Sequence, residues 1–296
     1  MKQILIPVDF SDSTFNSCKY AIEIATKTEP VSIWLFHVYA TQSYYNASYS
    51  SDAVISEPML PVDFIEEMKE MRKISEDNIN RLKAELSNYI NEKGYTNFTL
   101  NKFLVSGEPE WLIEDVCEEL HADGIIMSTS GKGDKSPLEG SMAMHIMGRA
   151  QIPVIAVPGQ YNDFKFNNVL YATKLDNIAD DIKAIKLLLS LFKHHNFTLY
   201  VVHFRKDDKE TVTMKELEDV FVKERLENRV RLMIINYENN TDATISSVTT
   251  QNNIDIIAFI THKTNPLKLL FSRGIHKDDF LATGIPVIGL PNFNKK

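Results

Sequence analysis

A glycine- and serine-rich segment, "STSGKGDKSPLEGS", occupies residues 128–141 and contains residue types suited to binding phosphate. It follows an apolar run, 124–127, and precedes residues 142–150, whose pattern predicts a helix. Glycine lets a backbone approach phosphate oxygens, and a helix amino terminus attracts anions. Ser141, at that terminus, could cap the helix or bond a phosphate oxygen. The segment is therefore either a phosphate-binding loop or an ordinary surface loop.

The run "GKGDKS" inside this segment is not a P-loop, because a P-loop requires Gly-Lys followed directly by Ser or Thr. Elsewhere no nucleophile has an identifiable base, and no group of His, Cys, Asp and Glu has the spacing of metal ligands. We therefore predict no catalytic residues and no metal site. His37 and His203 are interpreted as structural histidines, and His194 and His195 as the solvated end of a helix.

Composition places the chain among soluble globular proteins. It has 296 residues, enough for two domains, and is 44% hydrophobic and 24% charged. The net charge of −8 argues against nucleic acid as a partner, because phosphate backbones require clustered Lys and Arg. Cys18 and Cys117 lie in amphipathic helical patterns and are predicted to be core residues. Without a signal peptide pattern or an apolar run long enough to span a bilayer, we expect a cytoplasmic protein that does not bind membranes.

The second half of the chain repeats the first. The segments "QILIPVDFSD", "SIWLFHVY", "DGIIMS" and "IPVIAVP" recur in the same order as "NVLYATKLDN", "TLYVVHFR", "DIIAFI" and "IPVIGLP". A repeated order of this kind indicates a duplicated structural unit. We predict two tandem copies of one domain, at residues 1–160 and 166–296.

Within each copy, short apolar runs alternate with amphipathic helical patterns. Runs that are apolar throughout are typical of buried strands in parallel sheets. Strands that alternate with helices place helices on both faces of such a sheet. We therefore predict an α/β protein with two doubly wound domains, each containing a mostly parallel sheet of about five strands.

A long helix is predicted over residues 62–93, with a broken apolar stripe that packs against the sheet. The polar segment 41–61 before it is interpreted as a surface loop, with a lid or partner-binding role as the alternative. The apolar stripe of the helix predicted over residues 62–93 consists of Ile65, Met68, Ile79, Leu82 and Leu86.

The ordered segments resemble the universal stress protein family in its tandem form. The first copy carries the resemblance through "ILIPVDFSDST", "LFHVY", "VSGEPEWLIEDV" and "DGIIMSTSGKG…GSMAMHIMGRAQIPVIAVP", and the second matches more loosely. The resemblance implies a Rossmann-like fold related to the adenine nucleotide alpha hydrolases. It also implies ATP or AMP binding, a stress-response role and dimer formation. Few members have a defined enzymatic activity, so we expect slow ATP hydrolysis at most, with magnesium entering only with a triphosphate.

The resemblance also implies which residues form the nucleotide site. Asp9 and the backbone around Val8 and Val38 would hold the nucleoside, and the glycine loop would hold the phosphates. In open α/β sheets ligands lie at the carboxyl ends of strands, where Asp9 and this loop should meet. Asp9 could instead bond within the turn before a helix capped by Ser11 or Asp12. The full implied set is Pro7, Val8, Asp9, Val38, Met127, Ser128, Gly131, Gly140, Ser141 and Met142.

The glycine loop departs from the family pattern of Gly, two residues, Gly, nine residues, then Gly with Ser or Thr. Ser128 replaces the first glycine, and only eight residues separate Gly131 from Gly140. Pro137 and Glu139 also lie inside the loop, and a carboxylate is a poor neighbour for phosphate. A loop can absorb a deletion of one residue, so the pattern leaves nucleotide binding open.

The second copy departs further. Lys174 stands where Asp9 stands in the first copy, and one glycine, Gly274, remains in the segment that replaces the glycine loop. We therefore predict a degenerate, structural copy. Its last strand, "PVIGLP", is expected to pair with "PVIAVP", so that one chain mimics a dimer and covers an exposed strand edge. Further association of whole chains into a homodimer stays open.

Two functions are consistent with these features. The first is an adenine-nucleotide-binding protein with a stress-response or regulatory role, in which ATP or AMP occupies the first copy. The alternative is a tandem scaffold that binds no nucleotide and acts through an unknown protein partner or a small apolar ligand.

Overall fold

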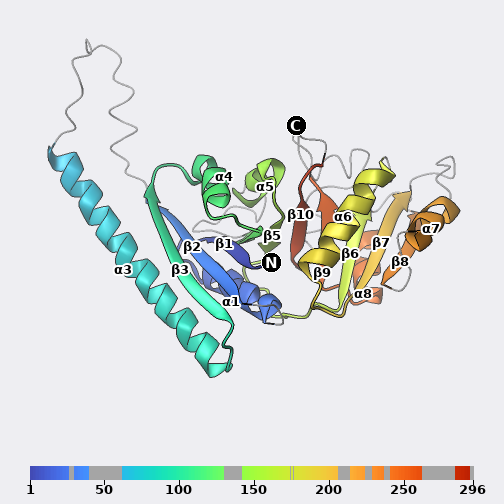
Figure 1. The fold of residues 1–296 in the computed structure, drawn as a ribbon, viewed down its shortest axis with the longest axis horizontal. Helices are drawn as coiled ribbons and strands as arrows, with labels where there is room; N and C mark the ends of the chain where they lie inside the picture. Colours follow the sequence, from blue (N-terminus) through green and yellow to red (C-terminus); the bar gives the residue numbers. More distant parts are fainter. Residues whose placement is uncertain are drawn as a thin grey trace, which may run out of the picture.

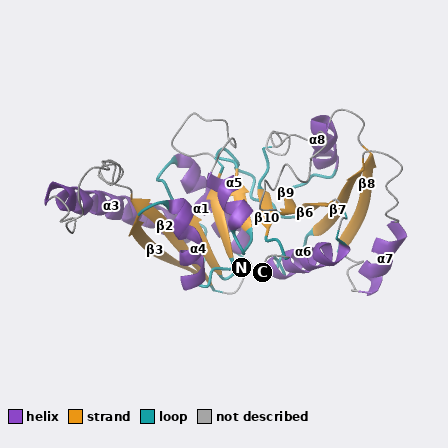
Figure 2. Cartoon of the chain, turned by 90° about the horizontal axis from the view of Figure 1, so that it is seen from above, coloured by secondary structure: helices purple, strands orange, loops and turns teal. Residues whose placement is uncertain are grey.

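The computed structural model describes residues 1–26, 30–39, 62–129, 142–173, 175, 177–205, 214–223, 229–236, 241–261 and 284–293. Within these ranges the chain forms one ten-stranded sheet with helices on both sides (Figures 1 and 2). The strand order is β3-β2-β1-β4-β5-β10-β9-β6-β7-β8.

The first half of the chain contributes five strands and the helices between them. In chain order these are β1 (Gln3–Pro7), α1 (Asp12–Ala25), β2 (Val31–Tyr39), α3 (Val62–Glu92), β3 (Phe98–Ser106), α4 (Pro109–Glu119), β4 (Gly124–Ser128), α5 (Met142–Arg149) and β5 (Val154–Val157). The helix predicted over 62–93 is confirmed as α3, which lies along β2 and β3 at one end of the molecule (Figure 1).

The second half repeats this arrangement. Its elements are β6 (Asn168–Thr173), α6 (Ile178–Leu191), β7 (Thr198–Arg205), α7 (Met214–Lys223), β8 (Val230–Asn236), α8 (Thr241–Gln251), β9 (Ile256–Ile260) and β10 (Val287–Leu290). Among the described strands, the pairs within each half are parallel, and the pair of β5 with β10, which joins the halves, is antiparallel. The predicted α/β fold class, with a mostly parallel sheet of five strands per copy, is confirmed.

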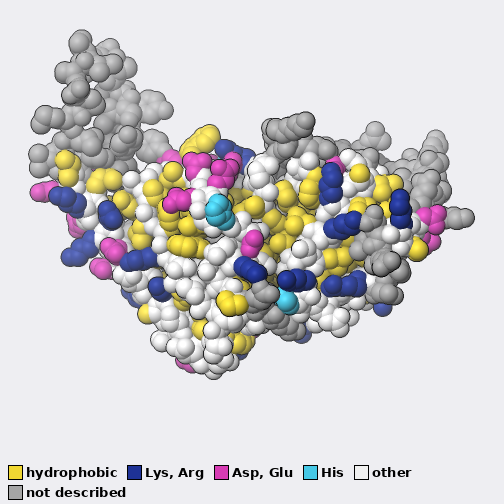
Figure 3. All heavy atoms as spheres, in the orientation of Figure 1, with side chains coloured by type: hydrophobic (Ala, Val, Ile, Leu, Met, Phe, Trp, Pro, Cys, Tyr) yellow, Lys and Arg dark blue, Asp and Glu magenta, His cyan; other side chains and the backbone are white. Residues whose placement is uncertain are grey.

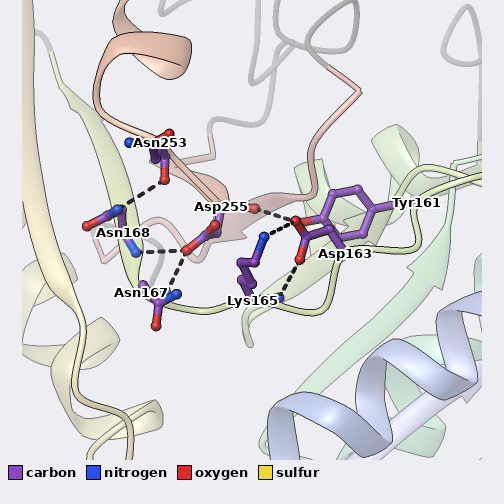
Figure 4. Close-up of polar contacts among 7 residues, drawn as sticks. All are labelled: Tyr161, Asp163, Lys165, Asn167, Asn168, Asn253 and Asp255. Atoms are coloured by element: carbon purple, nitrogen blue, oxygen red, sulfur yellow. Dashed lines mark hydrogen bonds and ion pairs between the residues drawn. The ribbon is translucent and has the colours of Figure 1, made fainter.

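Matching hydrogen bonds show that the repeat extends to individual residues. Asp123 Oδ2 accepts hydrogen bonds from the backbone N–H groups of Lys2 and Gln3, at 2.5 and 3.0 Å. In the second half, Asp255 Oδ2 accepts from Asn167 and Asn168, at 2.6 and 2.9 Å (Figure 4). One carboxylate in each half therefore connects two strand starts, those of β4 and β1 in the first half and those of β9 and β6 in the second.

The core consists of two apolar layers, one on each face of the sheet. One layer packs the sheet against α1, α3, α6 and α7, and the other packs it against α4, α5 and α8. Both predicted core cysteines are buried. The α3 stripe is only partly as predicted: Ile79, Leu82 and Leu86 are buried, but Ile65 is 42% exposed. Ile65 lies near the start of α3, beyond the part of the helix that contributes buried residues to the core.

The two halves join through β5 and β10, as the sequence predicts. Ile155 and Ile288 are directly paired and fully buried. Two further hydrogen bonds join the first half of the chain to the second. The Met1 amino group donates to the Leu191 carbonyl at 3.1 Å, and His195 Nε2 lies 2.6 Å from the Ile24 carbonyl. Because a carbonyl only accepts, His195 Nε2 donates this bond.

His195 corrects the sequence interpretation. The pair after α6 was expected to be solvated, yet His195 is only 6% exposed, whereas His194 is exposed. The His195 ring also lies 5.0 Å from that of Phe166, in the segment connecting the halves. It is buried because α1 and the connecting segment cover the end of α6, which the sequence of α6 alone cannot reveal.

Two fully buried tyrosines should make the fold sensitive to alkaline pH. Burial is the main cause that raises the pKa of Tyr20 and of Tyr171, with the Asp181 carboxylate adding to the effect at Tyr171. A folded-state pKa above the unfolded value gives stability that is complete below pH ~10 and is lost as pH rises further. We expect the unfolding free energy to fall by about 1.4 kcal/mol per buried tyrosine at about pH 11.

Urea unfolding at several pH values, followed with phenolate absorbance, measures this effect. Tyr20→Phe is the matched control, because the Tyr20 hydroxyl is buried and has no hydrogen-bond partner among the described residues. This variant should have the unfolding free energy of the parent near neutral pH, and its unfolding free energy should fall less at alkaline pH. An unfolding free energy that stays flat through this pH range would contradict the prediction.

Candidate functional site

The carboxyl end of β1 carries a network of short polar contacts. Asp9 Oδ1 accepts hydrogen bonds from the Ser11 backbone N–H, the Ser11 hydroxyl and the Thr14 hydroxyl, at 3.0, 2.6 and 2.5 Å. Ser11 is the N-cap of α1, and its Oγ accepts from the Thr14 N–H at 3.3 Å. Asp9 therefore bonds within the turn and Ser11 caps the helix, two contacts that the sequence had indicated as possible. These contacts also hold the carboxylate in a fixed place at the strand end.

The same sheet edge brings together most of the described site residues. Because β1 lies between β2 and β4 and runs parallel to both, the three strands end side by side. Pro7 closes β1, Ser128 closes β4, and Val38 is the penultimate residue of β2. Asp9 and Ser128 therefore lie at the carboxyl edge of adjacent strands, where α/β folds bind ligands.

The apolar members of the predicted set divide between the two faces of the sheet. Met127 is buried in the layer under α4 and α5, and Val38 and Met142 pack against that layer. Val8 belongs to the opposite layer, under α1. Met142 is the first residue of α5, which follows the glycine loop. Gly131, Gly140 and Ser141 lie outside the described residues.

Arg149, the basic residue in the last turn of α5, is paired with a residue of α4. Figure 3 shows acidic side chains gathered over α4 and basic ones over α6. Arg149 of α5 donates from Nε to Glu114 Oε1 at 2.8 Å, and its guanidinium lies 4.8 Å from the ring centre of Trp111, which is 64% exposed. The Arg149 side chain therefore joins α5 to α4 through Glu114 and Trp111.

The second copy has a different network at the matching strand end. The hydroxyls of Tyr171 and Thr173 donate to Asp181 Oδ1, at 2.5 and 2.6 Å, and all three residues are buried. Thr173 Oγ1 also accepts from the Leu175 N–H at 2.9 Å. The carboxylate thus comes from α6 and is held by the copy's own hydroxyls. Lys174 lies outside the described residues. Sequence reasoning missed Asp181, because its first-copy counterpart is not acidic.

The two histidines at the second-strand ends bind backbone carbonyls, as predicted. His37 Nδ1 lies 2.7 Å from the Val8 carbonyl, and His203 Nδ1 lies 3.2 Å from the Thr173 carbonyl. In the part of the chain that the structure describes, no group of three His, Cys, Asp or Glu could hold a metal ion. Among the same residues, no helix is both long and apolar enough to cross a membrane.

The chain is a tandem α/β protein with a doubly wound sheet and a polar site at the carboxyl edge of its first half. Comparison with known proteins identifies the family to which a protein of this class belongs. Residues 1–158 match the Universal stress protein family. The chain belongs to the universal stress protein family. It is 25% identical over 157 residues to a universal stress protein of Methanocaldococcus jannaschii, a match covering 53% of this chain and 81% of that protein.

A solved structure shares the fold of both halves. The crystal structure of a universal stress protein from Archaeoglobus fulgidus is 18% identical, with a TM-score of 0.67. The match covers 99% of this chain and 97% of that one. The tandem arrangement is therefore a fold that this chain shares with another protein of the family.

Proposed function

We propose that the first copy binds an adenine nucleotide, ATP or AMP, at the carboxyl edge of β1 and β4, and that the nucleotide acts as a regulatory ligand. The observation that carries the proposal is the Asp9 carboxylate, fixed by Ser11 and Thr14 beside the end of β4. A carboxylate held in one position can accept hydrogen bonds from a nucleoside without losing side-chain freedom on binding.

The proposed roles follow the family resemblance. Pro7, Val8, Asp9, Val38 and Met127 contact the nucleoside, and Ser128, Gly131, Gly140, Ser141 and Met142 form the phosphate end. Magnesium enters with a triphosphate and is held mainly by phosphate oxygens and water. Few members of the family have a defined enzymatic activity, so the proposal includes slow ATP hydrolysis at most.

The two halves of the chain have different functions under this proposal. Residues 1–160 form the nucleotide-binding domain, and residues 166–296 form a degenerate domain that completes the sheet through β10. The buried Asp181 network supports this assignment, because a carboxylate satisfied by Tyr171 and Thr173 stabilises the strand end itself.

The experiment is native mass spectrometry of the fresh protein, followed by calorimetric titration with Mg-ATP and with AMP. We expect one nucleotide per chain. Gly140→Asp should abolish binding, because it places a bulky negative charge where the proposal places phosphate. Gly274→Asp, at the remaining glycine of the corresponding second-copy segment, is the matched control and should bind as the parent does. Unchanged affinity in Gly140→Asp would remove this site assignment.

The alternative is a scaffold that binds a protein partner. The observation that favours it is Trp111, a large side chain that is 64% exposed on α4. This alternative expects no nucleotide in the mass spectrum and no heat at about millimolar nucleotide, near the weak end of useful affinity. A pull-down with residues 41–61 deleted, and another with Trp111→Ala, would then identify the surface that the partner uses.

A further inference from the structure

Phe10 adopts a backbone conformation that large side chains rarely occupy. Its φ is +60°, in the left-handed region, where a non-glycine residue experiences steric strain. Leu175, at the matching position of the second copy, has a φ of +61°. The turn after the first strand therefore has the same geometry in both copies, and each copy places a bulky side chain where glycine would relieve the strain.

The Phe10 ring packs against His37. The two ring centres are 4.3 Å apart with an interplanar angle of 44°, and Phe10 also contacts the core layer under α1. His37 Nδ1 lies 2.7 Å from the Val8 carbonyl, and because a carbonyl only accepts, Nδ1 donates. The Val8 N–H in turn donates to the Phe36 carbonyl at 2.8 Å. Both backbone groups of Val8 are thus bound to residues of β2.

The second copy lacks the ring contact. Leu175 provides an aliphatic side chain at the same backbone geometry, and the corresponding His203 Nδ1 lies 3.2 Å from the Thr173 carbonyl, compared with 2.7 Å for His37. Both histidines therefore reach the backbone carbonyl, and the first copy differs by the aromatic ring packed on its imidazole. A ring packed on imidazole restricts its rotation, so Phe10 favours the orientation in which Nδ1 reaches Val8.

We propose that Phe10 is a positioning residue for nucleotide binding in the first copy. It orients His37, which fixes the Val8 carbonyl and thereby the adjoining Asp9. This inference rests on the proposed function, because it takes Val8 and Asp9 to contact the nucleoside. Because the strained turn occurs in both copies, the feature particular to the first copy is the aromatic ring that the turn places against His37.

The experiment compares three variants of the full-length protein: Phe10→Gly, Phe10→Tyr and Leu175→Gly. AMP and Mg-ATP affinities are measured by calorimetry, and thermal midpoints are measured in parallel. We expect Phe10→Gly to bind nucleotide about tenfold more weakly, while its glycine relieves backbone strain. Phe10→Tyr keeps the ring and should bind within about threefold of the parent. Leu175→Gly, with the same change of backbone, should bind as the parent does.

A second measurement needs no nucleotide. Nitrogen-15 NMR of the histidine rings reports which ring nitrogen of His37 carries the proton. We expect the Nδ1–H form in the parent and in Phe10→Tyr, and a mixture of tautomers in Phe10→Gly. A parent that binds nucleotide no more tightly than Phe10→Gly, or an unchanged His37 tautomer in that variant, overturns the role of Phe10. A parent that binds no nucleotide overturns the proposed function and this inference with it.

Discussion

Ile288→Asp should lower the unfolding free energy by about 4 kcal/mol or more, because it places an unpaired carboxylate in a fully apolar layer. Ile288 is fully buried and is flanked by Ile155 of β5 and Ala258 of β9. The pairing of β5 with β10 is the only link between the two halves of the sheet within the described strands. Urea unfolding followed by far-ultraviolet circular dichroism measures the change.

Ile288→Val is the matched control for this substitution. It removes one methylene group and should cost about 1 kcal/mol, with a single cooperative transition. If Ile288→Asp were no more costly than Ile288→Val, the pairing of β5 with β10 would not be a closed, dry contact.

Gly289→Ala should destabilise the fold by about 1–3 kcal/mol, because no space is available for the added methyl group. A Cβ at this position would lie 2.8 Å from Thr261 Cγ2 and 3.1 Å from Met147 Cγ. Thr261 and Met147 are both 1% exposed, so neither can move into solvent. Since Met147 lies on α5, Gly289 allows a helix of the first half to pack onto a strand of the second.

Thr261→Ser provides a direct test of this cause, because it removes the nearest atom and keeps the hydroxyl that donates to the Leu290 carbonyl at 2.9 Å. The double variant, Gly289→Ala with Thr261→Ser, should lose less unfolding free energy than the sum of the losses in the two single variants. Additive losses in thermal and urea unfolding would show that the methyl group disturbs something other than this contact.

The fold could be predicted from the sequence because its signals are local and repeated. The apolar runs specify buried strands, and the duplicated "IPVIAVP" and "IPVIGLP" identify the two strands that join the halves. Ser11 was recognisable as a candidate cap from its residue type and position. These features depend on short stretches of chain and on the period of their side chains.

The rest could not be predicted because it depends on contacts between distant segments. His195 has the polar character of an exposed residue, but α1 and the connecting segment bury it. The positive φ of Phe10 has no sequence signal, since phenylalanine rarely adopts it and glycine would have indicated it. The carboxylate of Asp181 acquires its role only when α6 packs beside β6.

The antiparallel pair of β5 and β10 has a consequence for how the protein would bind the proposed nucleotide. The connecting segment makes the association of the halves intramolecular, so the paired state does not depend on protein concentration. A dimer of identical units presents two equivalent sites and permits steep, cooperative binding. With the single site proposed for this chain, the two halves would not bind nucleotide cooperatively, so occupancy of one chain would rise gradually with nucleotide concentration.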